Sequence, residues 1–365
     1  MKSLSGTTPT LRAIAVTLFA FSVSLLTGCA GNFHPVVNTT PSSIGASPSA
    51  PRTPGNTDST LGVAYNPSTD LLYVLKKGNV ASGYAGTVSV INRATNVITA
   101  TIPVGAWPYG VAVNQLTNTI YVTNYAGPSL SIINGATNVV TATIPNTGVG
   151  DTPYGVAVNP LTNKVYVTDI VGDLTYGMYV LNGTTGAVLS AIRTDGDVFS
   201  VAVNTLTNTI YATTQSAVLA INGDTDTVQA TVKGTINLSF GASGIVVDEA
   251  ANVVYVGSTT GSSNGGVTLI NGATNAIAST VALGSVPTNL ALDPVKHVVY
   301  ATMSNPSVVG VIDTTKNVAN ATISLVAAPV AVVVNPTTSL VYVTEASELA
   351  VINPTGSTTT DVLIK

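Results

Sequence analysis

A tyrosine that returns about every 45 residues constrains the fold of this chain more than any other feature. It stands at Tyr73, Tyr121, Tyr166, Tyr211, Tyr255, Tyr300 and Tyr342. The six spacings run from 42 to 48 residues. Self-similarity with a period of about 20–50 residues is typical of solenoids, propellers and other arrays of one supersecondary unit. The sequence therefore predicts seven copies of one unit, filling residues 58–365.

The repeat around Tyr121 shows what the unit contains. Short apolar runs are joined by turns rich in Asn, Thr and Gly, and they cover residues 109–114, 119–124, 130–133 and 139–144. Four strands in a repeat of this length match the blade of a β-propeller. A solenoid is the alternative, but it needs polar caps, and the first and last repeats are as apolar as the middle ones. The expected fold is all-β: a seven-bladed β-propeller of four-stranded antiparallel blades, with the repeated tyrosine packed between blades.

Two kinds of turn recur in the repeats. Asn-Gly lies between the third and fourth predicted strands at 134–135, 182–183, 222–223 and 271–272. Both residues tolerate positive φ, so we expect them to hold the left-handed positions of tight hairpins. Asn-Pro or Asp-Pro ends the first strand at 66–67, 159–160, 293–294 and 335–336. There the proline breaks the ladder, and the Asx side chain is expected to bond to the turn backbone.

The motif Tyr121-Val-Thr-Asn124 resembles the signature of the YVTN-repeat β-propellers. Residues 166–169 (Tyr-Val-Thr-Asp) and 342–345 (Tyr-Val-Thr-Glu) follow it closely, and the other four copies are looser. The resemblance covers residues 58–365 and implies a propeller. It implies little about activity, because the family consists of bacterial and archaeal surface-layer and secreted proteins whose function is mostly unassigned.

Closure of the ring has two possible forms. Many propellers mix strands from both chain ends in one blade, but here the first repeat begins with its own first strand at 61–65. The last repeat ends with its own fourth strand at 360–364. Closure then rests on packing between the first and last blades, unless residues such as Val36 and Val37 add a strand.

The first residues of the chain read as a targeting signal. Lys2 and Arg12 precede an apolar run at 13–26, as in a secretory signal peptide. The run ends Leu26-Thr-Gly-Cys29, which resembles the lipobox of bacterial lipoproteins and implies cleavage before Cys29 and acylation of that residue. The predicted organisation is a signal peptide at 1–28, a Pro/Ser/Thr-rich disordered tether at 29–57 and the propeller at 58–365. The protein is then lipid-anchored and extracytoplasmic, at the outer membrane if the host has two membranes, since Ala30 rather than Asp follows the cysteine.

Composition excludes several classes of function. Charged residues make up only 8% of the chain, the net charge is −4, and no basic cluster is present, so no nucleic-acid partner is expected. Two histidines and one cysteine leave no set of ligands for a His/Cys metal site. We predict no metal and no cofactor. Calcium stays open at the loop carboxylates Asp169, Asp173, Asp195, Asp197, Asp224 and Asp226, although none has EF-hand spacing.

Candidate ligand-binding residues lie in the loops that lead into the innermost strands. Trp107, Tyr109, Tyr154 and Phe199 fall on three consecutive repeats at this position. An aromatic crescent at a channel mouth can stack on a sugar or a peptide. The alternative, which we favour, is that these rings pack between neighbouring blades.

The expected function is that of a non-enzymatic binding scaffold at the cell envelope, with a cell-surface protein or a glycan as its ligand. No catalytic residue is assigned. A hydrolase or lyase for a small substrate needs several titratable groups at one channel mouth, and Asp195, Asp197, Asp248, Glu249 and His297 would have to converge there. A purely structural surface-layer component is the third possibility.

Overall fold

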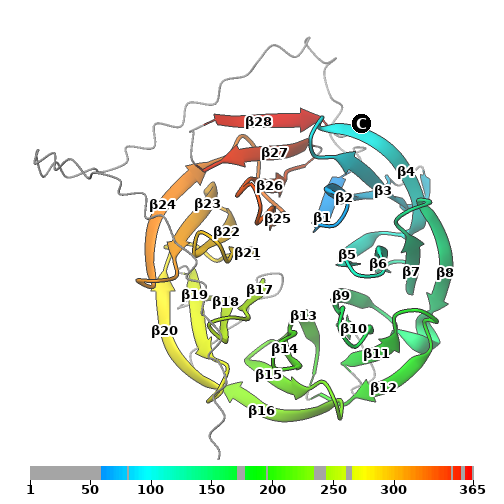
Figure 1. Cartoon of the computed structure of the whole chain (residues 1–365), viewed down its shortest axis with the longest axis horizontal. Helices are drawn as coiled ribbons and strands as arrows, with labels where there is room; N and C mark the ends of the chain where they lie inside the picture. The colour runs from blue at the N-terminus through cyan, green and yellow to red at the C-terminus, as the bar shows by residue number, and fades with distance from the viewer. Residues whose placement is uncertain are drawn as a thin grey trace, which may run out of the picture. The chain divides into compact units, whose positions relative to one another are not determined.

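A ring of seven antiparallel sheets, each of four strands, makes up the described part of the chain (Figure 1). The computed structural model describes residues 59–79, 82–170, 177–194, 196–233, 244–259, 265–346, 348–354 and 358–363. Each sheet is built from four consecutive strands, and we number these blades one to seven along the chain. The predicted all-β, seven-bladed propeller is confirmed. The predicted signal peptide, the tether and Cys29 lie outside the described residues.

The first strand of each blade lies at the centre of the ring and the fourth at its rim (Figure 1). Blades one to three contain β1 (Ser59–Asn66), β2 (Leu71–Lys77), β3 (Ala85–Asn92), β4 (Val97–Ala106), β5 (Pro108–Asn114), β6 (Thr119–Asn124), β7 (Ser129–Asn134), β8 (Val139–Pro145), β9 (Pro153–Asn159), β10 (Lys164–Asp169), β11 (Met178–Asn182) and β12 (Val188–Ile192). A short 3-10 turn, η2 (Asn146–Gly148), follows β8.

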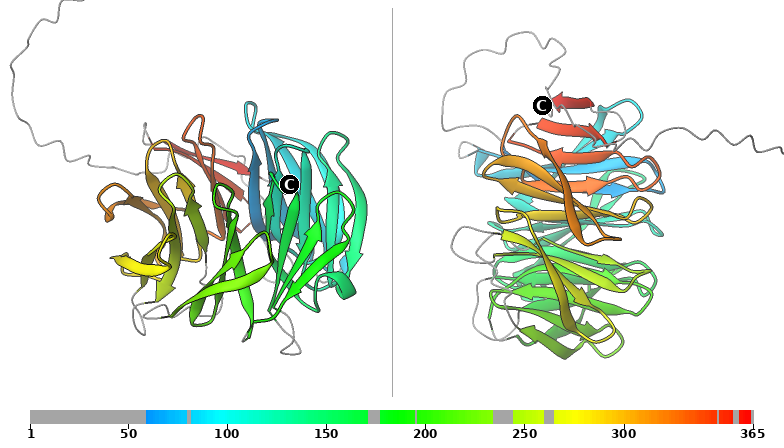
Figure 2. Two further views of the ribbon diagram at one scale, coloured as in Figure 1. Left: turned by 60° about the horizontal axis from the view of Figure 1, so that its bottom comes forward. Right: turned by 90° about the vertical axis from the view of Figure 1, so that its left-hand side faces the viewer.

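Blades four to seven repeat this order. They contain β13 (Val198–Asn204), β14 (Thr209–Thr214), β15 (Ala217–Asn222), β16 (Thr227–Lys233), β17 (Ile245–Asp248), β18 (Val253–Thr259), β19 (Gly265–Asn271), β20 (Ala276–Ala282), β21 (Asn289–Asp293), β22 (Val298–Ser304), β23 (Ser307–Asp313), β24 (Val318–Ser324), β25 (Ala331–Val334), β26 (Val341–Thr344), β27 (Glu348–Asn353) and β28 (Thr358–Leu363). In the further views the sheets of neighbouring blades face one another around the ring (Figure 2). Among the described residues, no helix has the length and apolar character needed to cross a membrane.

The core consists of apolar clusters that lie between neighbouring blades. One such cluster joins Val218 and Val232 of blade four to Ile245, Val254 and Ile270 of blade five. Strands two and three of a blade are buried on both faces, as in β6 and β7, whereas the outer strand β8 alternates between exposed and half-buried residues. Burial on both faces explains why the inner strands read as continuous apolar runs.

The repeated tyrosines fill the spaces between blades, as the sequence predicts. All seven are 0–2% exposed. The hydroxyl of Tyr121 donates to the backbone oxygen of Gly183 in the next blade at 2.8 Å, and that of Tyr211 to Gly272 at 3.4 Å. The tyrosine is therefore a structural residue of the interface between blades.

The ring closes by packing and hydrogen bonding between blades one and seven. Leu72 and Val74 of blade one share a cluster with Tyr342 and Leu349 of blade seven. The hydroxyl of Thr344 donates to the backbone oxygen of Leu61 at 2.8 Å. Within the described residues each of these blades consists of four strands consecutive in sequence. This agrees with closure by packing between the first and last blades. Val36 and Val37 lie outside the described residues.

The Asx turns form as predicted, but the explanation of the Asn-Gly turns is wrong. Ser68 donates its backbone N–H to Oδ1 of Asn66 at 3.0 Å. In the Asn134-Gly135 turn, however, the left-handed residue is Asn138, with φ 56°. A Cβ on Gly135 would overlap the Oδ1 of Asn118 and would lie 2.8 Å from its backbone oxygen. The glycine is needed for this close approach, because Gly135 also donates its N–H to that oxygen at 2.8 Å.

Candidate functional site at the channel mouth

Three of the predicted aromatic residues begin the inner strands of consecutive blades. Tyr109, Tyr154 and Phe199 are the second residues of β5, β9 and β13. In β5 the strand register shifts between Pro108 and Val111, so the Tyr109-Gly110 segment bulges away from the ladder. Such bulges change the direction of a side chain at the edge of a sheet. The hydroxyl of Thr123 fills the gap by accepting the N–H of Gly110 at 2.8 Å and donating to the backbone oxygen of Tyr154 at 2.6 Å.

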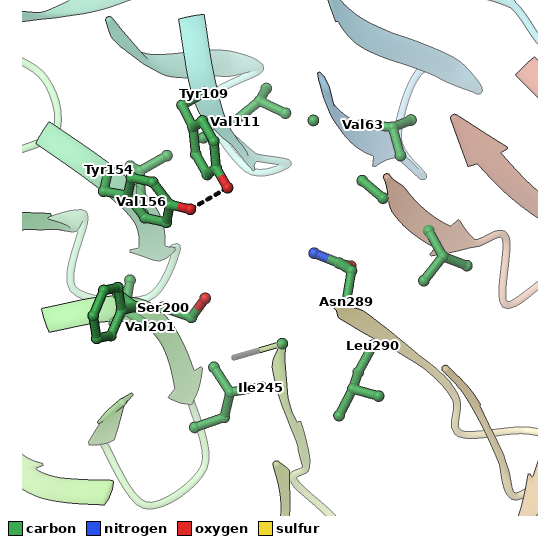
Figure 3. A pocket seen from close by; sticks show the side chains of 17 residues that line it. Val63, Tyr109, Val111, Tyr154, Val156, Ser200, Val201, Ile245, Asn289 and Leu290 are labelled. Carbon is green, nitrogen blue, oxygen red and sulfur yellow. Dashed lines mark hydrogen bonds between the residues drawn. The ribbon is translucent and has the colours of Figure 1, made fainter. Parts of the chain in front are cut away.

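Tyr109 and Tyr154 form a stacked pair at the channel mouth. Their ring centroids are 3.8 Å apart with an interplanar angle of 28°. The hydroxyl of Tyr154 donates to the hydroxyl of Tyr109, and both oxygens lie at the channel side of the rings (Figure 3). Burial raises the pKa of both phenols above the ordinary value, and proximity to Tyr109 raises that of Tyr154 further. Both hydroxyls are therefore protonated at neutral pH and available as hydrogen-bonding groups.

The opposite wall of the channel carries an amide. Asn289, the first residue of β21, faces the two tyrosines across the opening, with Ser200 of β13 between them (Figure 3). The Asn289 side chain forms no hydrogen bond with another described residue, because only its backbone contacts the hydroxyl of Thr302. Thr288, at the rim, pairs its hydroxyl with that of Thr302 at 3.0 Å.

These groups line two adjoining cavities. One measures about 250 Å³ and the other about 260 Å³, and they share Gly62, Tyr109, Tyr154, Ser200, Asn289 and Ala331. The larger draws further walls from Leu61, Pro329 and Val330 at the rim. Deeper in the channel the lining is aliphatic, with one side chain from each blade: Val63, Val111, Val156, Val201, Ile245, Leu290 and Val332. The described lining residues of both cavities carry no charged side chain.

The fourth predicted residue, Trp107, lies in a neighbouring aromatic cluster of blades one and two. Its ring stacks on Tyr84 at 5.8 Å and meets the edge of Tyr125 at 5.4 Å. The Nζ of Lys77 lies 3.6 Å from its ring centroid, a cation–π contact. Tyr125 also meets Tyr154 edge-on at 6.4 Å, so the two groups of aromatic rings are continuous.

The four predicted aromatic residues also differ in how deeply their side chains are buried. Phe199 is 1% exposed and packs edge-on against Tyr154 at 6.3 Å, whereas the other three are half-buried. Phe199 therefore supports the tyrosine pair from behind. No role at the site was predicted from the sequence for Tyr84, Tyr125, Lys77, Ser200 or Asn289. A comparison of repeats contains the signal for the last two, because Gly62, Gly110, Gly155 and Gly244 stand at the same position in other blades.

The titratable residues considered for catalysis are distributed over both ends of the inner strands. Asp197 precedes β13 at the mouth just described, whereas Asp248 and Glu249 stand at the far end of β17. They line another cavity, of about 640 Å³, whose other walls are mostly aliphatic. His297 is exposed in the turn after β21, with φ 56°. Asp195 and Asp173 lie outside the described residues.

The carboxylates considered for calcium have structural contacts. Asp169 is 6% exposed and accepts the N–H and the hydroxyl of Thr152, each at 2.9 Å, while burial raises the pKa of its carboxyl group. Asp226 forms an ion pair with Lys164 at 2.9 Å. Asp224 accepts the side-chain amide of Asn208 at 2.8 Å. Within the part of the chain that the structure describes, no group of three or more His, Cys, Asp or Glu side chains is placed to hold a metal ion.

Comparison with known proteins gives a likeness of fold. No protein-family model matches the chain, and no curated protein matches it in sequence. Among solved structures, Kuenenia stuttgartiensis hydrazine synthase is similar, with a TM-score of 0.65 and 17% sequence identity. The match covers 86% of this chain and 99% of that chain. At this identity the likeness extends to the fold alone: the chain is a seven-bladed β-propeller.

Proposed function

We propose that this chain is a YVTN-type propeller lipoprotein that acts as a non-enzymatic binding module at the cell envelope. Cys29 carries the lipid and anchors the propeller on the extracytoplasmic side, at the outer membrane in a host with two membranes. The ligand, a glycan or a surface protein, enters the channel mouth between the tyrosine pair and Asn289. Nucleic acid is not a partner.

The observation that carries this proposal is the described lining of the mouth, which has hydrogen-bonding groups and no charged side chain. Tyr109, Ser200 and Asn289 come from three different blades and converge on one opening (Figure 3). The polar groups of Ser200 and Asn289 are not required by the blades that hold them, since other repeats have glycine or alanine at these two positions. Loops and ends on one face of a repeat protein usually form its binding surface.

Enzymatic hydrolysis receives less support from this geometry. A general acid or base has to lie within hydrogen-bonding distance of the reacting group. Among the described lining residues of the mouth, the ionisable groups are phenols whose pKa burial raises, which makes them poor bases at neutral pH. Asp248 and Glu249 lie at the opposite end of the inner strands. A purely structural role leaves the convergence of Tyr109 and Asn289 without a purpose.

A binding screen with the full chain in detergent micelles tests the proposal. Envelope glycans and peptides serve as probes, and the double variant Tyr109→Phe/Tyr154→Phe keeps both rings while removing both hydroxyls. Each hydrogen bond contributes about 0.5–1.5 kcal/mol, so we expect the affinity to fall about tenfold. Tyr65→Phe is the matched control, because Tyr65 bonds to Asp70 at 2.9 Å outside the mouth. Absence of any ligand, or ligands that bind the double variant unchanged, would overturn the proposal.

A further inference from the structure

We infer that the channel mouth binds an uncharged sugar residue at the end of a glycan. The inference rests on the proposed function and specifies its ligand. It follows from the hydrogen-bonding groups of the mouth, from the absence of a charged side chain among its described lining residues, from its size and from the departures from the repeat that create it.

The hydrogen-bonding groups of the mouth suit a ligand whose own groups both donate and accept. The hydroxyl oxygen of Tyr109 accepts the hydrogen bond of the Tyr154 hydroxyl, so the O–H of Tyr109 remains free to donate to a ligand. Across the opening, the Asn289 side chain offers an N–H₂ donor and a carbonyl acceptor, and the Ser200 hydroxyl offers both. Sugar hydroxyls are donors and acceptors at once, so one ring can bridge the two walls.

The absence of charge among the described lining residues selects against ionised ligands. Removing a charge from water without a partner costs far more than burying a neutral hydroxyl group that forms a hydrogen bond. A carboxylate, sulfate, phosphate or ammonium group would find no counter-charge on the described lining of either cavity. An uncharged sugar is therefore favoured over a uronic acid, a sialic acid or a peptide terminus.

Each cavity of the mouth has dimensions and walls that suit one sugar ring. The two cavities measure about 250 and 260 Å³, below the volumes of about 300–1,000 Å³ of sites for drug-sized ligands. Leu61, Pro329 and Val330 present aliphatic surface at the rim, and Val63, Val111 and Leu290 do so deeper in the channel. A sugar ring has C–H surface as well as hydroxyl groups, and it can satisfy both kinds of wall. The open mouth admits the end of a glycan, with a sugar ring in each cavity at most.

The two polar side chains break the repeat at a position where the fold favours glycine. A Cβ on Gly110 would lie 2.6 Å from the backbone oxygen of Tyr154, and one on Gly155 would lie 2.6 Å from that of Phe199. The tight approach of neighbouring inner strands thus explains the glycines. Ser200 and Asn289 depart from this pattern, and the channel contains both departures. Their side chains form no hydrogen bond to another described residue, so a ligand gives them a use that the fold does not.

Binding of glycans and peptides to two asparagine variants tests the inference. The full chain in detergent micelles is presented with neutral oligosaccharides, with sialylated, uronic-acid-bearing and sulfated ones, and with a peptide library. Asn289→Asp changes one amide to a carboxylate of the same shape, and Asn289→Gly restores the residue of the other repeats. Asn320→Asp is the matched control, because Asn320 is exposed on the outer strand of the same blade. Thermal unfolding of each variant verifies that it folds.

The expected result is binding of neutral oligosaccharides that weakens at least tenfold in Asn289→Asp and in Asn289→Gly, and that Asn320→Asp leaves unchanged. If charged glycans or peptides bound instead of neutral oligosaccharides, with the same dependence on Asn289, the assignment of an uncharged sugar would be overturned. The proposed binding function would remain intact. Neutral glycans that bind equally to the wild type and to both Asn289 variants would also overturn it. If no probe of any class bound, the proposed function itself would fall.

Discussion

The threonine two residues after a repeat tyrosine explains why the motif reads Tyr-Val-Thr. In blade three, Thr168 accepts the N–H of Gly155 at 2.7 Å within its own blade and donates to the backbone oxygen of Phe199 in the next blade at 2.9 Å. One hydroxyl thus satisfies a bulged strand and joins two blades. In blade five Gly257 stands in place of the threonine. The contact within the blade is then a backbone hydrogen bond, from the N–H of Gly257 to the oxygen of Gly244 at 2.9 Å.

The Asn-Gly turns allow a test at single residues of what the glycine is for. We expect Gly135→Ala to lower the free energy of unfolding by about 1–3 kcal/mol, because the added methyl group overlaps Asn118 in a packed turn. Asn138→Gly is the matched variant in the same turn. It relieves the left-handed backbone of Asn138, at φ 56°, and should change stability by no more than about 1 kcal/mol. Urea unfolding measures both variants. A larger loss of stability in Asn138→Gly than in Gly135→Ala would favour the explanation by positive φ at the glycine.

Neighbouring blades are joined by a ladder of asparagine pairs at the far ends of the inner strands. The Nδ2 of Asn114 donates to the Oδ1 of Asn163 in the next blade at 2.9 Å. The same bond recurs in the pairs 66–118, 159–208 and 204–252, at 2.8–2.9 Å. In blades five and six the strand-end residue is an aspartate instead, Asp248 and Asp293. The ladder is therefore a feature of blades one to five.

The junction between blades three and four contains a partly buried ion pair whose removal should be costly. The Nζ of Lys164 lies 2.9 Å from Asp226 and donates to the backbone oxygen of Gly223 at 2.8 Å, and the two side chains are 19% and 9% exposed. Lys164→Met leaves a carboxylate and a carbonyl without their donor, so we expect a loss of about 2–4 kcal/mol in urea unfolding. Lys316→Met is the control, since Lys316 is 71% exposed and its pair with Asp313 is worth at most about 1 kcal/mol. Equal effects of the two variants would show that the interface does not depend on this pair.

For the molecule as a whole, the repeat was predictable and the site was not. The spacing of Tyr73 to Tyr342 predicts seven blades because each tyrosine occupies the same space between sheets. The positions of Tyr109 and Tyr154 at the start of inner strands also follow from the repeat. Asn289 stands out in the repeats only as a departure from glycine, and its position opposite the tyrosines depends on closure of the ring, which the sequence does not show. The bulges that turn Tyr109 toward the channel are likewise a product of contacts between blades.

The buried tyrosines make the whole ring sensitive to alkali. Burial in the interfaces raises the pKa of Tyr121, Tyr300 and Tyr342 from 10.0 to about 12. Between these values the unfolded chain loses protons that the folded chain retains, so stability is complete below pH 10 and falls as pH rises toward 12. Between pH 10 and 12 each tyrosine contributes a slope of about 1.4 kcal/mol per pH unit, and the three together a slope of about 4 kcal/mol per pH unit.

Domains are stable by only about 5–15 kcal/mol, so we expect the propeller to unfold before these tyrosines ionise in the folded state. Tyrosinate absorbance and the loss of the far-UV circular dichroism signal should then coincide in an alkaline titration. In Tyr300→Phe one phenol is absent, and the slope of unfolding free energy against pH above pH 10 should decrease by about 1.4 kcal/mol per unit. Urea unfolding at neutral pH separates this change of slope from any change in packing. Full tyrosinate absorbance in a chain that keeps its circular dichroism would contradict the expectation, because phenols buried between blades cannot ionise while the blades stay together.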